Sequence, residues 1–318
     1  MPPSPAMTTL FYHHSSALRH EMPEGHPERA DRIRAIHHAL SAETFQALDR
    51  REAPEAPLEA LTLAHPAEWV DALVAAATAA GMVQIDSDTI MSPGTMEAAR
   101  RGAGAAIAGV DAVFGGEAAN AFVAMRPPGH HAETTRAMGF CFFNNAAIAA
   151  RHAQKKHGAE RVAIMDFDVH HGNGTQDIFW GDRTVLYAST HEMPLYPGTG
   201  RSTERGEHDT IVNAPLVSGA DGETFRAVME GRILPRIEEF EPDLVVISAG
   251  FDAHYRDPLA SLRLKEEDFA WATARLMEAA DKHAGGRVVS VLEGGYDLQG
   301  LSASVAAHVA TLMGREGG

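Results

Sequence analysis

The sequence is short of cysteine, of basic residues and of long apolar runs. Among its 318 residues there is a single cysteine, Cys141, which excludes an intramolecular disulfide and a cysteine-rich zinc module. Lysine and arginine number 27 against 43 aspartates and glutamates, for a formal net charge of −16. Nonspecific nucleic-acid affinity comes from clustered basic side chains, so we expect no direct nucleic-acid binding. The same acidic field would attract a basic substrate.

The chain also lacks signals for a membrane or for division into domains. No apolar run approaches the length of a membrane span, and residues 1–14 contain no basic segment followed by an apolar one. We therefore expect a cytoplasmic protein with no membrane partner. A hydrophobic content of 45% supports one large core, and no repeat or linker interrupts the chain. The simplest organisation is a single domain over residues 1–318, with its core at 8–314.

Short apolar runs alternate with longer stretches of helical character. Runs that end in glycine or polar residues lie at 120–125, 161–168, 184–190, 243–250 and 287–295. Helices are predicted at 28–40, 66–80, 94–114, 144–157, 222–239, 265–284 and 300–313. Nearly continuous apolar strands that alternate with helices indicate an α/β fold, in which helices cover both faces of a mostly parallel sheet.

Polar clusters follow four of these predicted strands. RPPGHH follows the first run, DFDVHHGN the second, FDAH the fourth and EGGY the fifth. In an open parallel sheet, ligands bind beyond the carboxyl ends of the strands. We therefore expect the four clusters to form one active site at that edge.

Asp168, His170 and Asp252 are the candidate metal ligands. The first two are two residues apart, so on an extended strand exit their side chains would lie on the same side, and Asp252 follows another strand. Three protein ligands with an open position for water suit a catalytic Zn²⁺ ion, and two carboxylates with one imidazole also suit Fe²⁺. The alternative is a helix cap, a turn residue and a core histidine, which the set of three together disfavours.

The tandem histidines His130 and His131 lie on a turn that two prolines and a glycine make rigid. Neighbouring imidazoles with different partners can differ in proton affinity, so one can take a proton from water while the other stabilises charge. Asp166 and Asn173 are candidate acceptors for their far nitrogens. Tyr296 follows two glycines and is a candidate donor to an oxyanion, with a packed tyrosine after a turn as the alternative.

Five ordered segments closely resemble the zinc-dependent histone deacetylases, in particular the class II and bacterial deacetylase-like amidohydrolase branch. They are RPPGHHAETTRAMGFCFFNNAAIAA, VAIMDFDVHHGNGTQDIFW, STHEMPLYPGTG, VISAGFDAHYRDPL and LEGGYDL. The similarity begins at GHPERADRIRAI and extends to the last helix. It implies a single arginase/deacetylase-like domain with a central eight-stranded parallel sheet. It also implies an enzyme that hydrolyses the amide of an acylated amine, with acetyl-lysine as the expected substrate type.

The resemblance implies a role for each candidate residue. The zinc ligands would be Asp168, His170 and Asp252. His131 corresponds to the general base and His130 to its electrostatic or acid partner. Asp166 matches the carboxylate behind the first histidine, and Tyr296 matches the tyrosine that polarises the acyl carbonyl. Asn173 stands where class I members carry Asp, which supports the class II placement and predicts a less basic His131.

Further positions match residues around the substrate. They are Gly139, Phe140, Tyr196, Leu259 and Gly294. Gly139 and Phe140 correspond to one wall of an acyl-lysine tunnel, and Tyr196 is the simplest choice for the opposite wall, although Leu195 adjoins it. Polyamine-specific relatives carry a glutamate where this chain has Leu259, which argues against that specialisation and leaves it open. Hydrolysis of an acylated small metabolite is a further alternative.

The family also implies structural monovalent cations, with potassium expected, and an internal product channel. One cation site would use Asp166, Asp168, His170 and Ser189, and the other Phe179, Asp182 and Val185, mainly through backbone carbonyls. Asp182 departs from the common threonine, which weakens the second site. Arg32 resembles the arginine of the product channel.

Two other classes of function stay open. A binuclear manganese ureohydrolase would need further bridging carboxylates, as in DxHxD, but His171 and Gly172 follow the first ligand pair here. A non-catalytic binder of acyl ligands could share the fold and the metal, although the intact His130, His131 and Tyr296 set favours an enzyme. The sequence carries no signal for an oligomeric state.

Overall fold

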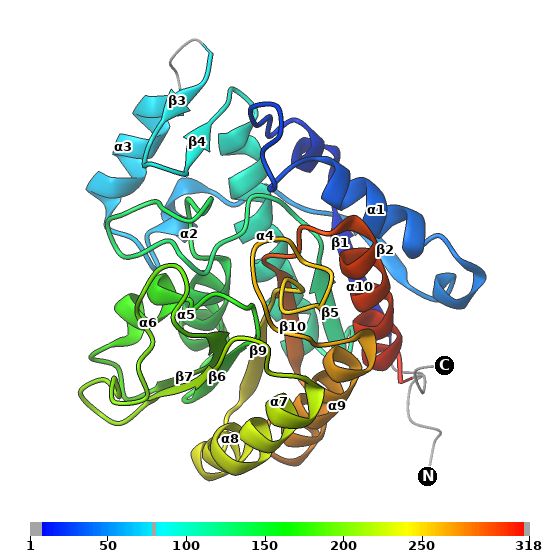
Figure 1. Cartoon of the computed structure of the whole chain (residues 1–318). Coiled ribbons are helices and arrows are strands. Elements are labelled where there is room, and N and C mark those ends of the chain that lie inside the picture. The colour runs from blue at the N-terminus through cyan, green and yellow to red at the C-terminus, as the bar shows by residue number, and fades with distance from the viewer. Residues whose placement is uncertain (1–7, 78–80, 315–318) are drawn as a thin grey trace.

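The computed structural model describes residues 8–77 and 81–314, which form a central sheet with helices on both sides (Figure 1). The sheet has eight strands in the order β2-β1-β5-β10-β9-β6-β7-β8, and all neighbouring strands are parallel. The strands are β1 (Thr9–His13), β2 (Asp49–Glu52), β5 (Asn120–Val123), β6 (Val162–Asp166), β7 (Val185–Glu192), β8 (Ile211–Leu216), β9 (Leu244–Ala249) and β10 (Val288–Leu292). A small antiparallel pair, β3 (Val83–Gln84) and β4 (Ile90–Met91), lies outside the sheet.

The helices divide between the two faces of the sheet as right-handed crossovers require. They are α1 (Asp31–Ala39), α2 (Leu58–Leu61), α3 (Ala67–Ala77), α4 (Thr95–Phe114), α5 (Asn145–His157), α6 (Asn173–Phe179), α7 (Gly222–Val228), α8 (Leu234–Phe240), α9 (Glu266–His283) and α10 (Leu298–Leu312). The crossover through α5 moves across the sheet in one direction and the crossover through α9 moves back, so the two helices lie on opposite faces. Accordingly α4 packs with α5, while α10 packs with α1 and α9 (Figure 1).

The predicted α/β class and eight-stranded parallel sheet are confirmed. All five strands predicted from apolar runs are present, and each is buried along its whole length. The pattern missed β1, β2 and β8; of these, β2 reads DRRE and is an edge strand with alternating exposure, so it carries no continuous apolar run.

The seven predicted helices are also present, with two differences. The segment predicted at 222–239 is interrupted by a π-helical turn, Met229–Ile233, between α7 and α8. Of the helix predicted at 66–80, the structure describes α3, and residues 78–80 lie outside the described residues. Within the parts of the chain that the structure describes, no helix is long and apolar enough to cross a membrane.

A fully buried ion-pair network connects the start of α1 to two loops at the carboxyl edge of the sheet. Glu28 accepts hydrogen bonds from Arg126 Nε, from Arg126 Nη2 at 2.7 Å and from Arg32 Nη1 at 3.2 Å. Arg126 opens the RPPGHH loop, and Arg32 donates to the carbonyls of Glu293 and Gly295 at 2.5 and 2.6 Å. Glu28 therefore neutralises the two guanidiniums that hold the loops after β5 and β10.

We expect the Glu28→Gln substitution to lower the free energy of unfolding by about 3–5 kcal/mol, because it leaves two buried guanidiniums without a carboxylate. Burial acts to raise the pKa of Glu28, but Arg126 and His20 hold it well below its ordinary value. Since the folded-state pKa is lowered, this contribution is present at neutral pH and is lost only as the pH falls into the acid range. Urea unfolding at pH 7 measures the loss. The exposed Glu24→Gln is the control, and equal stabilities would contradict the assigned role.

Candidate functional site

The four polar clusters meet because the strands that precede them are neighbours. β5, β10, β9 and β6 are adjacent in the middle of the sheet, so their carboxyl ends lie side by side (Figure 1). The loops after these strands carry RPPGHH, EGGY, FDAH and DFDVHHGN. The structure therefore brings together residues that are up to 166 positions apart, from His130 to Tyr296.

Asp168, His170 and Asp252 offer ligand atoms that all lie within 4.8 Å of one another. His170 Nδ1 is 3.1 Å from Asp168 Oδ1 and 3.1 Å from Asp252 Oδ2. The expected extended strand exit is wrong, because β6 ends at Asp166. The Asp168 amide instead donates to Asp166 Oδ1 at 3.1 Å and the His170 amide to Asp168 Oδ1 at 2.9 Å. In each of these turns, which are typical of aspartate, the side chain accepts a hydrogen bond from the amide two residues further on, and this orients the candidate ligands.

Backbone amides orient both carboxylates of this set. Gly294 N donates to Asp168 Oδ2 at 2.8 Å, and Val169 N donates to Asp252 Oδ1 at 2.8 Å. Burial acts to lower the pKa of His170, but the hydrogen bonds that its imidazole donates to Asp168 and Asp252, together with the charges of these carboxylates, raise it to about 10. A divalent cation would replace the proton that these groups share. The set therefore fits a metal ion through its chemistry and its orientation.

The two histidines of the GHH turn have different partners. His130 Nδ1 lies 2.9 Å from Asp166 Oδ2, and His131 Nδ1 lies 2.8 Å from Asn173 Oδ1. Burial acts to lower the pKa of both imidazoles. The carboxylates of Asp166, Asp168 and Glu293 nevertheless raise the pKa of His130 well above its ordinary value. The pKa of His131 lies well below its ordinary value, because burial and the neighbouring imidazoles of His130 and His170 disfavour a second proton. These surroundings therefore favour the charged form of His130 and the neutral form of His131.

The tautomer of His131 follows from the orientation of Asn173. Asn173 Nδ2 donates to Glu133 Oε1 at 2.7 Å, which turns its oxygen toward His131. His131 Nδ1 must then donate, and its Nε2 is left as an acceptor. His131 also lines the adjoining pocket, so a neutral nitrogen base faces the space available to a substrate.

This pocket has a volume of about 240 Å³ beside the metal ligands. Its lining residues are Asp88, His131, Gly139, Phe140, His170, Leu195, Tyr196, Leu259 and Tyr296. Four of the five predicted substrate residues are among them, and both Leu195 and Tyr196 contribute. The fifth, Gly294, lies instead against the metal ligands, where an added Cβ would be 2.1 Å from Asp252 Oδ2.

Three aromatic residues line the pocket: Phe140, Tyr196 and Tyr296. Phe140 lies edge-on to Tyr296, with 6.0 Å between ring centroids, and Tyr196 lies edge-on to His131 at 5.1 Å. Gly139 has a φ of 57°, and an added Cβ would lie 2.3 Å from His131 Cδ2. Only glycine fits there without displacing the imidazole.

Tyr296 is held by neighbours on both sides. Its amide donates to Asp257 Oδ2 at 2.7 Å, and the Arg32 guanidinium lies 4.9 Å from its ring centroid. Burial raises the pKa of the Tyr296 hydroxyl well above its ordinary value, so the group is a proton donor at neutral pH. Arg32, predicted to line a product channel, is fully buried and contacts the EGGY turn.

Two residues of the site carried no predicted role. Glu293 accepts hydrogen bonds from the amides of Gly129 and His130 at 2.7 and 3.1 Å, and burial raises its pKa to about 7. The sequence signal that could have identified Glu293 is its position directly after a buried apolar strand. Asp88 accepts from Gly139 N at 3.0 Å, but it lies between β3 and β4, where no strand-end pattern points to it.

The residues predicted for the first cation site lie together, since Asp166 pairs with Ser189 across β6 and β7, and Asp168 and His170 follow in the adjoining loop. The second set, which includes Val185 at the start of β7, has a different neighbour. Arg151 Nη1 is 2.6 Å from Asp182 Oδ2, and its guanidinium lies 4.7 Å from the Phe179 ring centroid. A second cation would therefore lie beside a fixed positive charge, which disfavours it.

A parallel eight-stranded sheet with these side chains at its carboxyl edge defines an arginase/deacetylase-like domain. Residues 26–312 match the histone deacetylase domain family, and the chain belongs to that family. It is accordingly an enzyme of the deacetylase class, a hydrolase of amide C–N bonds.

Relatives agree with this assignment. The chain is 42% identical over 301 residues to a probable deacetylase of Archaeoglobus fulgidus, covering 92% of this chain and 83% of that protein. It is 42% identical over 277 residues to the histone deacetylase-like amidohydrolase of Pseudomonas aeruginosa, covering 86% and 73%. The crystal structure of the HDA15 HD domain superposes with a TM-score of 0.92 at 36% identity, covering 98% of this chain and 90% of that one.

We expect Asn173→Asp to move the acid limb of the pH profile of kcat/KM to higher pH by about one to three units, because a carboxylate beside an imidazole favours its charged form. His131 acts as a base only when it is neutral, so a higher pKa of His131 moves the onset of activity to higher pH. Initial rates from pH 5 to 9 measure the shift. The exposed Gln46→Glu is the matched control, and an unchanged limb for Asn173→Asp would contradict the pairing with His131.

Proposed function

We propose that the protein is a metal-dependent deacetylase of N-acylated amines, with acetyl-lysine as the favoured type of substrate. The observation that carries this proposal is that His131, His170 and Tyr296 face one pocket with aromatic sides. An apolar passage suits the alkyl arm of lysine, and the reacting groups at its end suit an amide. The names of the relatives support the same chemistry.

Asp168, His170 and Asp252 would hold the ion, with Zn²⁺ as the first choice and Fe²⁺ as the second. When bound, such an ion polarises an acyl oxygen and lowers the pKa of a water molecule. Gly294 and Val169 supply amides that orient the carboxylates of Asp168 and Asp252, which keeps the donor atoms in one arrangement.

The protein's own groups would move the protons. His131 Nε2 takes a proton from the attacking water, and the Tyr296 hydroxyl donates to the oxygen on which negative charge develops. His130, whose charged form Asp166 favours, would stabilise negative charge in the site. One of the two histidines then returns a proton to the departing amine. The products are a free amine and a carboxylate.

The proposal extends to the surroundings of the enzyme. We include in it a structural potassium ion, held by Asp166, Asp168, His170 and Ser189. We also include a cytoplasmic location, because the single cysteine, Cys141, is buried and forms no disulfide that would require an oxidising compartment.

A binuclear ureohydrolase is disfavoured by the position of His171. His171 Nδ1 lies 2.8 Å from Thr199 Oγ1, and its ring packs 4.8 Å from that of His191. At the carboxyl edge of the sheet, the described residues hold one convergent ligand set, and His171 is not part of it. A single metal ion fits this arrangement better than a bridged pair.

We expect Tyr296→Phe to lower kcat on an acetyl-lysine peptide by about 10²–10³-fold, because it removes one donor to the oxyanion. Asp252→Ala should lower both bound zinc and turnover, since it removes a ligand. Rates on a fluorogenic peptide and zinc content measure these effects. The exposed Tyr255→Phe is the control. Wild-type rates for both site variants would refute the proposal.

We expect Leu259→Glu to raise kcat/KM for acetylputrescine relative to an acetyl-lysine peptide. Leu259 lines the pocket, so a carboxylate there would attract the distal ammonium of a short diamine. Parallel turnover of both substrates gives the ratio, with Leu259→Gln as the uncharged control. A ratio that favours acetylputrescine already in the wild type would instead support the polyamine alternative.

A further inference from the structure

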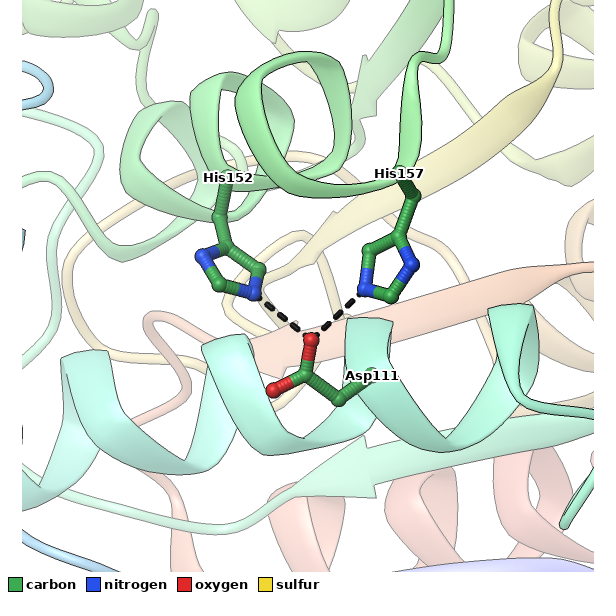
Figure 2. A group of neighbouring side chains, drawn as sticks. All are labelled: Asp111, His152 and His157. Atoms are coloured by element: carbon green, nitrogen blue, oxygen red, sulfur yellow. Dashed lines mark hydrogen bonds and ion pairs between the residues drawn. The ribbon is translucent and has the colours of Figure 1, made fainter.

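A second cluster of metal-binding side chains joins α4 to α5, away from the pocket. His152 Nε2 donates to Asp111 Oδ1 at 2.7 Å, and His157 Nε2 donates to the same oxygen at 2.6 Å. Figure 2 shows both imidazoles pointing from α5 toward the carboxylate on α4. Ligand atoms of all three residues lie within 4.8 Å of one another, and within the described parts of the chain only the site at Asp168 forms another such group.

The arrangement gathers nitrogen atoms around one oxygen. A neutral imidazole has a single N–H group, so both rings must hold their proton on Nε2 to make these hydrogen bonds. An ion would need each ring only to move that proton to Nδ1, which frees Nε2 as a ligand. Phe114 stacks on His157 with 4.8 Å between ring centroids and an interplanar angle of 11°, which limits the orientation of this ring.

The electrostatic surroundings favour a cation. Asp111 lies in the last turns of α4, and His157 is the final residue of α5. The carboxyl ends of helices carry partial negative charge, and α4 and α5 both end here. Burial acts to raise the pKa of Asp111, but the two histidines lower it overall, so the carboxylate is ionised at neutral pH. A divalent ion would therefore meet the negative charge of Asp111 and the Nε2 atoms of two imidazoles.

The cluster is open to ions from solvent. The side chain of Asp111 is 48% exposed, while those of His152 and His157 are 16% and 21% exposed. The histidines are thus packed enough to be held in place, and the carboxylate leaves room for water as a further ligand. Two imidazoles suit Zn²⁺, Co²⁺, Ni²⁺ or Cu²⁺ rather than Mg²⁺ or Ca²⁺, which take oxygen ligands.

We propose that Asp111, His152 and His157 form a second metal site, which binds a divalent ion of the zinc class and links α4 to α5.

This site would act on stability rather than on the reaction. The parallel topology places the ends of α4 and α5 at the amino edge of the sheet, opposite the pocket. The other end of α5 lies at the active site, where its N-cap residue Asn144 donates to the Ala132 carbonyl at 3.4 Å. A helix of 13 residues is about 20 Å long, so the ion would be remote from the acyl group. It would stabilise the position of α5, the helix that supports the GHH turn.

The test uses the metal-stripped full-length protein and Zn²⁺ alone, titrated in competition with a chromophoric chelator. We expect wild type to bind one zinc ion more per chain than His152→Gln/His157→Gln. Glutamine can still donate a hydrogen bond to Asp111 but is a poor zinc ligand, so this variant keeps the link between the helices and loses the ion. His38→Gln/His208→Gln, which changes two exposed histidines, is the matched control and should bind zinc as wild type does.

Two further measurements separate this site from the catalytic one. Asp252→Ala should lose one zinc ion and keep the other, and its combination with His152→Gln/His157→Gln should lose both. Zinc should raise the melting temperature of His152→Gln/His157→Gln less than that of wild type, with deacetylase turnover unchanged.

Asp111→Asn should reduce zinc affinity as well. This single variant is a control for the case in which the double variant loses zinc only because it misfolds. Equal zinc content and equal thermal shifts in wild type and His152→Gln/His157→Gln would overturn the proposal.

Discussion

The central constraint in this protein is the burial of negative charge at the carboxyl edge of the sheet. Asp166, Asp168, Asp252 and Glu293 are all fully buried there. Carboxylates removed from water are costly unless cations and hydrogen-bond donors compensate them. His130 and backbone amides supply part of that compensation, and a divalent ion between Asp168 and Asp252 would supply more. This demand for positive charge is one reason why candidate metal ligands lie beside a histidine whose pKa is raised.

The same field separates the two imidazoles of the GHH turn. His130 faces a carboxylate that favours its charged form, whereas His131 faces a neutral amide and its surroundings favour the neutral imidazole. The partner behind each imidazole, Asp166 or Asn173, is one cause of this difference, and the repulsion between the neighbouring imidazoles is another. The Glu28 network supports this division from outside, because its two arginines fix the loops that carry the histidines and Tyr296.

Much of the fold could be predicted because the buried strands are continuous apolar runs and the helices between them are long. The edge strand β2 could not, since DRRE has no apolar run, and the π-helical turn between α7 and α8 leaves no mark in the pattern. The aiming of Asp168 and His170 was predicted from an extended strand, but carboxylate-to-amide turns set it. Such turns depend on the local choice between competing hydrogen bonds, which periodicity does not reveal.

The sequence by itself determined the class of the protein, because residue types at strand ends and long ordered motifs are properties of the chain. It also determined which residues could bind a metal or move a proton. Only the tertiary structure decided how they pair: Glu293 with the GHH turn, Arg32 with Tyr296, and Asp111 with two histidines from another helix. These contacts join residues that are distant in sequence, and only the packing of the sheet and its helices brings them together.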